Sequence, residues 1–253
     1  DNICYKECVQ FLEIEDSAQR KINDINIVKP RSHCPECKKT ICWYQNIPII
    51  SYILLKAKCA HCKTKIPATY PLVEILTACA FVIQGFYFNL SFEWFASCIL
   101  TSGLISISMI DINHRLIPDE INLLLLWIGL NINIQHSFST LDEAVLGATF
   151  GYSSLWLFAK AYEKTTQKVA MGHGDFKLLA CSGAWLGWQQ LPFIILASSL
   201  VASIIGLVLI IMKYRSKDTQ IPFGPYLSSA IWIALIWGDD IMLTYYSFFD
   251  LGF

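Results

Sequence analysis

The sequence is poor in charged residues. Only 15% of its 253 residues are Asp, Glu, Lys or Arg, whereas a soluble domain carries about 25%. Apolar residues make up 55% of the chain and gather in long runs. These two features exclude a disordered chain, a nucleic-acid-binding domain and an ordinary water-soluble globule. We therefore expect a lipid bilayer, and no nucleic acid, among the partners of the chain. No signal peptide is visible.

The composition changes near residue 66. Residues 1–66 hold 11 of the 19 Lys and Arg residues, and the sequence from Pro67 onward consists of apolar segments with short polar breaks. A helix needs about 20 mainly apolar residues to span the hydrocarbon core. Seven segments, two of them short, have this character: 70–90, 95–112, 121–134, 144–162, 178–188, 193–212 and 222–237. We predict an all-α polytopic membrane protein with about seven transmembrane helices over residues 67–253 and a small polar domain over residues 1–66.

Lys and Arg are absent from every second polar break. The breaks without them are 91–94, 135–143, 189–192 and 238–253. Loops that carry Lys and Arg stay on the cytoplasmic side of a membrane. If residues 1–66 are cytoplasmic and all seven segments cross, all 19 positive residues lie on the cytoplasmic side. This sidedness predicts a multi-pass protein with its N-terminal domain in the cytoplasm.

Four of the ten cysteines form two CxxC pairs, Cys34–Cys37 and Cys59–Cys62, which are separated by 21 residues. Each pair is able to present two thiolates from a tight turn, and two such turns complete a tetrahedral Cys₄ zinc shell. The alternatives are disulfides, which are disfavoured on the cytoplasmic side, and a thioredoxin-type redox pair, although no βαβ pattern surrounds either CxxC pair. Cys42 could replace one of the four ligands, and His61 is within reach of the site. We predict a structural zinc site that folds a small domain with little core of its own.

Two carboxylates border the predicted bilayer, where ionisable groups are costly and usually functional. Asp111 ends one apolar segment and Asp175 precedes another, so both belong to cytoplasmic helix ends. Two facing carboxyl groups sharing one proton are able to activate water, as in aspartic proteases. The alternative is that both residues cap helices, which suits Asp175 but not Asp111, because acids are unfavourable at helix C-termini. Gly172 and Gly174 suit a tight turn beside Asp175 that an extended peptide can approach.

Several motifs together resemble those of bacterial type IV prepilin peptidases. They are Ser32–Lys38, Trp43–Tyr52, Cys59–Cys62, Tyr70–Glu74, Asp111 with Ile117–Asp119, Gly172–Asp175 with Lys177–Ala180, and Ile221–Tyr226. The resemblance covers about residues 31–237. It implies a GxGD-type aspartic endopeptidase of the bacterial inner membrane, with Asp111 and Asp175 as the catalytic pair. Glu74 and Lys177 lie in the matching motifs and are candidates to support the site. For Glu74, one turn into a membrane segment, the equal alternative is a residue that only extends to the membrane interface.

The resemblance also implies a substrate and a second activity. Members of this family remove the leader from type IV prepilins or type II secretion pseudopilins at the cytoplasmic face. Many then methylate the new N-terminus with S-adenosylmethionine, and the cysteine domain has been associated with that step. By resemblance Cys34, Cys37, Cys59 and Cys62 bind zinc. No glycine-rich nucleotide-binding loop is evident, so methylation rests on the resemblance alone.

Two further expectations concern the N-terminus and an alternative function. Family members begin with an additional membrane helix that has no counterpart before Arg31, and the chain starts at Asp1 without an initiator Met. Either an eighth, N-terminal helix is missing from this chain or this member is atypical, and the absence of an initiator Met favours the first alternative. The alternative function is a non-proteolytic, zinc-tethered membrane scaffold of a pilus or secretion assembly, in which the two acids only cap helices.

Overall fold

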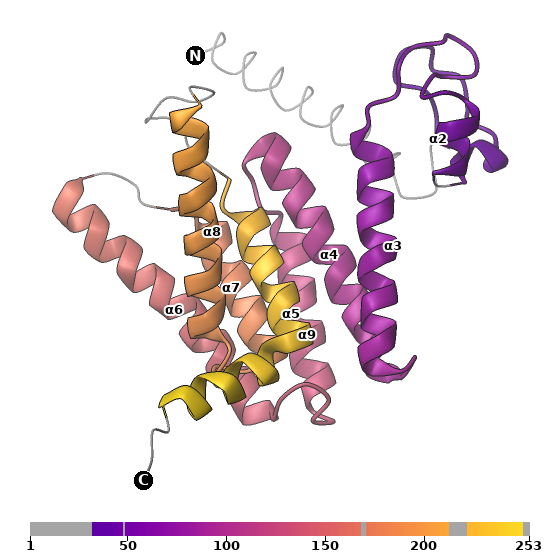
Figure 1. Ribbon diagram of the computed structural model, residues 1–253. Coiled ribbons are helices and arrows are strands. Elements are labelled where there is room, and N and C mark those ends of the chain that lie inside the picture. The colour runs from indigo at the N-terminus through magenta and orange to yellow at the C-terminus, as the bar shows by residue number, and fades with distance from the viewer. Residues whose placement is uncertain (1–31, 48, 168–170, 213–221, 250–253) are drawn as a thin grey trace, which may run out of the picture. The chain divides into compact units, whose positions relative to one another are not determined.

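The computed structural model describes residues 32–249, apart from residue 48 and residues 168–170 and 213–221. It begins with two short helices, η1 (Trp43–Asn46) and α2 (Ile50–Leu54). The longer helices are α3 (Thr69–Phe88), α4 (Phe92–His114), α5 (Asp119–Asn133), α6 (Leu141–Thr166), α7 (His173–Leu186), α8 (Leu191–Ile211) and α9 (Gly224–Phe249). The described ranges contain isolated β-bridges but no β-strand. The predicted all-helical fold is confirmed (Figure 1).

The chain divides into two compact units, Asp1–Ile75 and Leu76–Phe253. The division falls within α3 and lies nine residues after the end of the polar domain predicted from composition, 1–66. The first unit contains the cysteine pairs, η1 and α2. The polar stretch 1–30, which the sequence analysis did not assign to a motif, lies outside the described residues.

Helix α7 is the central helix of the second unit. Its sides contact α5, α6, α8 and α9, and Figure 1 shows it in the middle of the bundle. Ten of its 14 residues are buried, among them Phe176 and Trp185. A helix that is apolar all round is stable only when other helices cover it. Because the surrounding helices cover α7, this short helix of 14 residues is stable in the middle of the bundle.

Glycines bring the backbones of α6 and α7 into contact. A Cβ atom added at Gly147 would lie 2.4 Å from the carbonyl oxygen of Gly183, and one at Gly151 would lie 2.6 Å from that of Leu179. Small residues permit this close approach between helices where lipid provides no hydrophobic drive. The GxxxG spacing of Gly147 and Gly151 thus serves packing within the bundle.

Polar side chains join α5 to α7. The indole N–H of Trp185 donates to the carbonyl oxygen of Leu125 at 2.8 Å. The amide of Asn133, the last residue of α5, donates to the carbonyl oxygens of Ala184 and Trp185, each at 2.9 Å. The last carbonyl groups of a helix have no partner within it, so Asn133 caps the C-terminus of α7.

Helices α3 and α8 expose large apolar side chains. Leu196, Leu200 and Ile211 of α8 are more than half exposed, an arrangement that lipid stabilises and water does not. Four segments are long and apolar enough to cross a membrane: α3, α4, α8 and Gly224–Thr244 of α9. α5 and α7, with 15 and 14 residues, are shorter than about 20. Seven crossings therefore stay a prediction.

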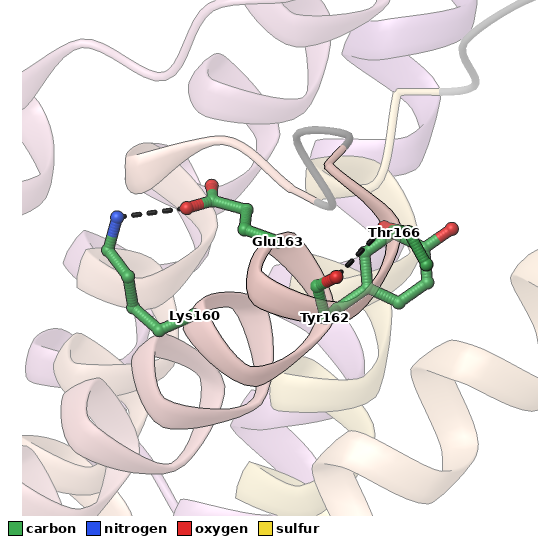
Figure 2. Close-up of polar contacts among 4 residues, drawn as sticks. All are labelled: Lys160, Tyr162, Glu163 and Thr166. Atoms are coloured by element: carbon green, nitrogen blue, oxygen red, sulfur yellow. Dashed lines mark hydrogen bonds and ion pairs between the residues drawn. The ribbon is translucent and has the colours of Figure 1, made fainter.

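The C-terminal end of α6 carries the polar residues that end the helix. Figure 2 shows Lys160 Nζ paired with Glu163 Oε2 at 2.9 Å, and the hydroxyl of Thr166 donating to the carbonyl oxygen of Tyr162 at 2.8 Å. The following residue, Gln167, ends the helix in a left-handed conformation. These contacts mark the end of the apolar part of α6.

The close contact between Gly147 and Gly183 predicts that one added methyl group lowers the stability of the bundle. Gly183→Ala places its Cβ 2.2 Å from a backbone oxygen of Gly147, so α6 and α7 must separate and stability falls by about 1–3 kcal/mol. Gly85→Ala is the matched control, because its nearest contact is 3.5 Å away. Thermal unfolding in detergent measures both variants. An unchanged melting temperature for Gly183→Ala would contradict the close contact.

Candidate active site and metal centre

Asp111 is a buried carboxyl group, 5% exposed, in the last turn of α4. Its Oδ2 atom accepts a hydrogen bond of 2.9 Å from the backbone N–H of Gly224, the first residue of α9. The first N–H groups of a helix lack partners within the helix and carry partial positive charge. The N-terminus of α9 therefore stabilises a carboxylate that lies at the unfavourable end of its own helix.

Asp175 is the second buried carboxyl group, 8% exposed, in the first turn of α7. The two carboxyl groups are close enough for an electrostatic interaction between them. Asp111 comes from α4, Asp175 from α7 and the N–H donor from α9, so three helix ends meet here. The structure thus brings together the two acids that the sequence analysis singled out.

The two glycines flank the turn at the start of α7, in which the backbone N–H of Asp175 donates to the carbonyl oxygen of Gly172 at 3.3 Å. Gly172 is the N-cap of α7 and has an extended backbone that any residue adopts. A Cβ atom at Gly174 would lie 2.8 Å from Cβ of Ile117, in the loop before α5. The absence of a side chain at Gly174 therefore lets Ile117 pack against the first turn of α7.

Lys177 forms an ion pair with Asp119, the first residue of α5. Its Nζ atom lies 2.6 and 2.8 Å from the two carboxylate oxygens. The pair joins the first turns of α5 and α7. The ion pair therefore holds the first turn of α7 next to the first turn of α5. Asp175 lies in that turn of α7, so Lys177 helps to position it.

The two CxxC pairs form turns with the same backbone pattern. The N–H of the first cysteine donates to the residue five positions later: Cys34 to Lys39 at 3.0 Å, and Cys59 to Thr64 at 2.9 Å. Each turn is flanked by an antiparallel bridge, His33 with Thr40 and Lys58 with Lys65. Two matching turns of this kind are typical of a zinc knuckle.

The four sulfur atoms fit a tetrahedral zinc ion. All four lie within 4.8 Å of one another, and Sγ of Cys34 is 3.8 Å from Sγ of Cys62. Zn–S bonds of about 2.3 Å place the sulfurs of a tetrahedral shell about 3.8 Å apart. The hydroxyl and backbone N–H of Thr64 lower the pKa of Cys62 to about 6. Cys34, Cys37, Cys59 and Cys62 would hold the ion as thiolates, and it would stabilise the first unit.

Glu74 is a structural contact of the first unit. Its Oε2 atom accepts a hydrogen bond of 3.0 Å from the backbone N–H of Ile49, which precedes α2. Ile49 has a φ of 61°, and a positive φ is unfavourable for a β-branched residue. Glu74 thus ties the segment between the cysteine pairs to the start of α3.

Gly224 is a site residue that the sequence analysis did not place in the site. A Cβ atom at this position would lie 2.7 Å from Oδ2 of Asp111. Only glycine leaves room for the carboxyl group to reach the backbone N–H. The flanking prolines, Pro222 and Pro225, were a signal that this turn begins a helix.

Comparisons with known proteins match both parts of the chain. Residues 98–207 match the type IV leader peptidase family, and residues 9–88 match the bacterial Peptidase A24 N-terminal domain. No solved structure matches the chain.

Three curated relatives carry the name prepilin leader peptidase/N-methyltransferase. The one from Pseudomonas aeruginosa is 47% identical over 223 residues, which are 88% of this chain and 77% of the relative. The one from Legionella pneumophila is 41% identical over 95% of this chain and 83% of the relative. The one from Neisseria gonorrhoeae is 45% identical over 85% and 74%.

The cysteine geometry predicts one zinc ion per chain. Cys34→Ser and Cys62→Ser each remove a ligand and should lower the zinc content of the purified chain severalfold. Cys42→Ser is the matched control, since Cys42 lies in the same unit but outside the cluster. Elemental analysis by mass spectrometry measures the ratio of zinc to protein. Full zinc content in Cys34→Ser would contradict the site.

Proposed function

Because the chain belongs to the type IV leader peptidase family, we propose that it cleaves the leader peptide of prepilins or type II secretion pseudopilins with Asp111 and Asp175. The observation that supports this proposal is the pairing of two buried carboxyl groups at the meeting point of α4, α7 and α9. The family membership confirms the resemblance seen in the motifs and makes the chain an enzyme.

In the proposed reaction the two carboxyl groups share one proton, because close like charges disfavour double ionisation. The ionised group takes a proton from water, whose oxygen forms a bond to the carbonyl carbon of the scissile peptide. The protonated group donates to the carbonyl oxygen. When the C–N bond breaks, the carboxyl group that took the proton from water donates it to the leaving amine. The other carboxylate takes back a proton from a hydroxyl of the intermediate, which becomes the new carboxyl group, so the pair again holds one proton. The N–H of Gly224 keeps Asp111 in position throughout.

The chain is a multi-pass membrane protein, because its four long apolar helices agree with its membership of the family. We propose that it lies in the bacterial inner membrane with the first unit and both acids on the cytoplasmic side. The proposal rests on the absence of Lys and Arg from every second polar break. The leader would then be cut where a prepilin's apolar helix leaves the bilayer.

We further propose that the chain methylates the N-terminus that cleavage creates. The names of the relatives include N-methyltransferase, and S-adenosylmethionine supplies a methyl group on a positively charged sulfur. Zinc in the Cys₄ cluster would keep the first unit folded while leaving no open coordination position for a substrate. A non-proteolytic scaffold is disfavoured, because a scaffold has no need of two buried acids that interact.

If the two acids form the proposed catalytic pair, cleavage requires both carboxyl groups. Asp111→Asn and Asp175→Asn should each lower the rate of leader cleavage at least about 100-fold, because acid–base catalysis is lost. Asp142→Asn, an exposed acid in the first turn of α6, is the control. The measurement is cleavage of a purified prepilin in detergent, with circular dichroism to verify folding. Processing at the wild-type rate by either variant would refute the pair and favour the scaffold.

The proposed orientation predicts opposite labelling of two positions. A cysteine introduced as Gln135→Cys should react with a membrane-impermeant maleimide in intact spheroplasts, since residues 135–143 lie outside in this topology. Thr166→Cys, at the end of α6, should react only after lysis, and the unmodified chain serves as the baseline. The reverse pattern would show that the orientation is inverted.

A further inference from the structure

One amide side chain in the core of the second unit has no hydrogen-bond partner at either end. Asn122 of α5 is fully buried, and neither its Nδ2 nor its Oδ1 atom is paired with another group in the described part of the chain. Other buried amides of this unit are paired. Gln84 donates to the hydroxyl of Thr101, and Asn133 donates to the carbonyl oxygen of Ala184. Because an unpaired buried amide destabilises a fold, packing alone does not explain Asn122.

Asn122 lies in the seam between α4, α5 and α7. The buried residues of α5 are three or four positions apart and therefore form one face of the helix: Asn122, Leu125, Gly129 and Asn133. A Cβ atom at Gly103 of α4 would lie 2.4 Å from Cδ1 of Leu125. A Cβ atom at Gly129 would lie 2.4 Å from Cδ1 of Trp185 of α7. The face that carries Asn122 thus packs against both neighbouring helices.

One acid of the proposed pair adjoins this seam on α7. Helices α5 and α7 lie side by side and run in the same direction, because Asp119 pairs with Lys177 in their first turns. Asn133 joins their last turns. Asn122 follows Asp119 by three residues, so it lies next to the part of α7 that carries Asp175.

The other acid reaches the seam from α4. Asp111 lies in the last turn of α4, and residues 115–118 connect that turn to the start of α5. Side chains on a helix lean towards its N-terminus. The amide of Asn122 is therefore directed along the seam, towards the end at which both carboxyl groups lie.

A second unpaired polar group lies on the α9 side of the same acids. Ser228 is 4% exposed, and its hydroxyl has no hydrogen-bond partner within the described ranges. The adjacent Ser229 donates to the carbonyl oxygen of Pro225 at 2.8 Å, as serine commonly does inside a helix. Ser228 follows Gly224 by four residues and shares its face of α9, and Gly224 is the residue that binds Asp111. Unpaired polar groups thus flank the acids on two helices.

We propose that Asn122 is a positioning residue of the catalytic pair, whose amide holds an internal water molecule that hydrogen-bonds to one of the two carboxyl groups. Buried waters typically make about three hydrogen bonds to groups that are otherwise unpaired. The amide both donates to the water and accepts from it, and the water donates to the ionised carboxylate and fixes its direction. Ser228 binds water on the α9 side in the same way. The inference rests on the proposed peptidase and assigns what keeps its acids oriented.

The test compares two substitutions of Asn122 in the full chain in detergent. Asn122→Leu, of similar size but apolar, should lower kcat for prepilin cleavage about tenfold and change KM less than about twofold, because it disturbs the orientation of the acids and not substrate binding. Asn122→Ser keeps a polar group in place and should recover most of kcat. Circular dichroism verifies folding.

Each substitution has a matched control. Asn131→Leu lies on the same helix, but Asn131 is exposed and its amide donates to the carbonyl oxygen of Trp127. This variant should cleave like the wild type. Ser228→Ala and Ser229→Ala form a second pair, of which only Ser228→Ala should lower kcat, because the hydroxyl of Ser229 is already paired within its helix.

An experimental structure that shows ordered water tests the site without any activity. A water molecule within hydrogen-bond distance of Asn122 and of Asp111 or Asp175 supports the inference, and an amide that contacts no water overturns it. It is likewise overturned if folded Asn122→Leu cleaves prepilin like the wild type, or if Asn122→Ser is as slow as Asn122→Leu. If the water is present but the wild type cleaves no prepilin, the water site is supported and the proposed peptidase is not.

Discussion

The second unit depends on the close packing of α7 against its neighbours. In lipid, helices gain little from burying apolar surface against one another, so backbone contact and hydrogen bonds must hold them together. The glycines of α6 and α7 provide that contact, and Asn133 closes the C-terminus of α7. Because α7 is fixed along its whole length, its first turn presents Asp175 at a defined place.

The same constraint explains why the polar groups of the candidate site come from helix ends. A carboxyl group buried in a bundle needs a partner, and the first N–H groups of a helix are the backbone donors still free. Gly224 supplies one of them to Asp111. On the adjoining helices, Lys177 and Asp119 join the first turns of α7 and α5.

The first unit follows a different principle, since it contains little buried apolar surface. Among its described residues, Cys34 is the buried hydrophobic one. Two short turns with matching hydrogen bonds place four thiol groups around one point, and a metal ion there would replace a core. The contact between Glu74 and Ile49 adds a link to α3.

Local patterns were sufficient to predict the helices and the cysteine cluster, and they singled out two acids that the structure buries, Asp111 and Asp175. An apolar run and a CxxC spacing each belong to one continuous segment of the chain, so they can be recognised without knowledge of the fold. Contacts between distant segments were not predictable in this way: Asp111 with Gly224, Lys177 with Asp119, and Gly147 with Gly183. The glycines beside Asp175 were noted from the sequence, but the approach of Ile117 to Gly174 was not predictable from it. Such pairings arise only when the helices pack, because packing decides which residues of remote segments share one small space.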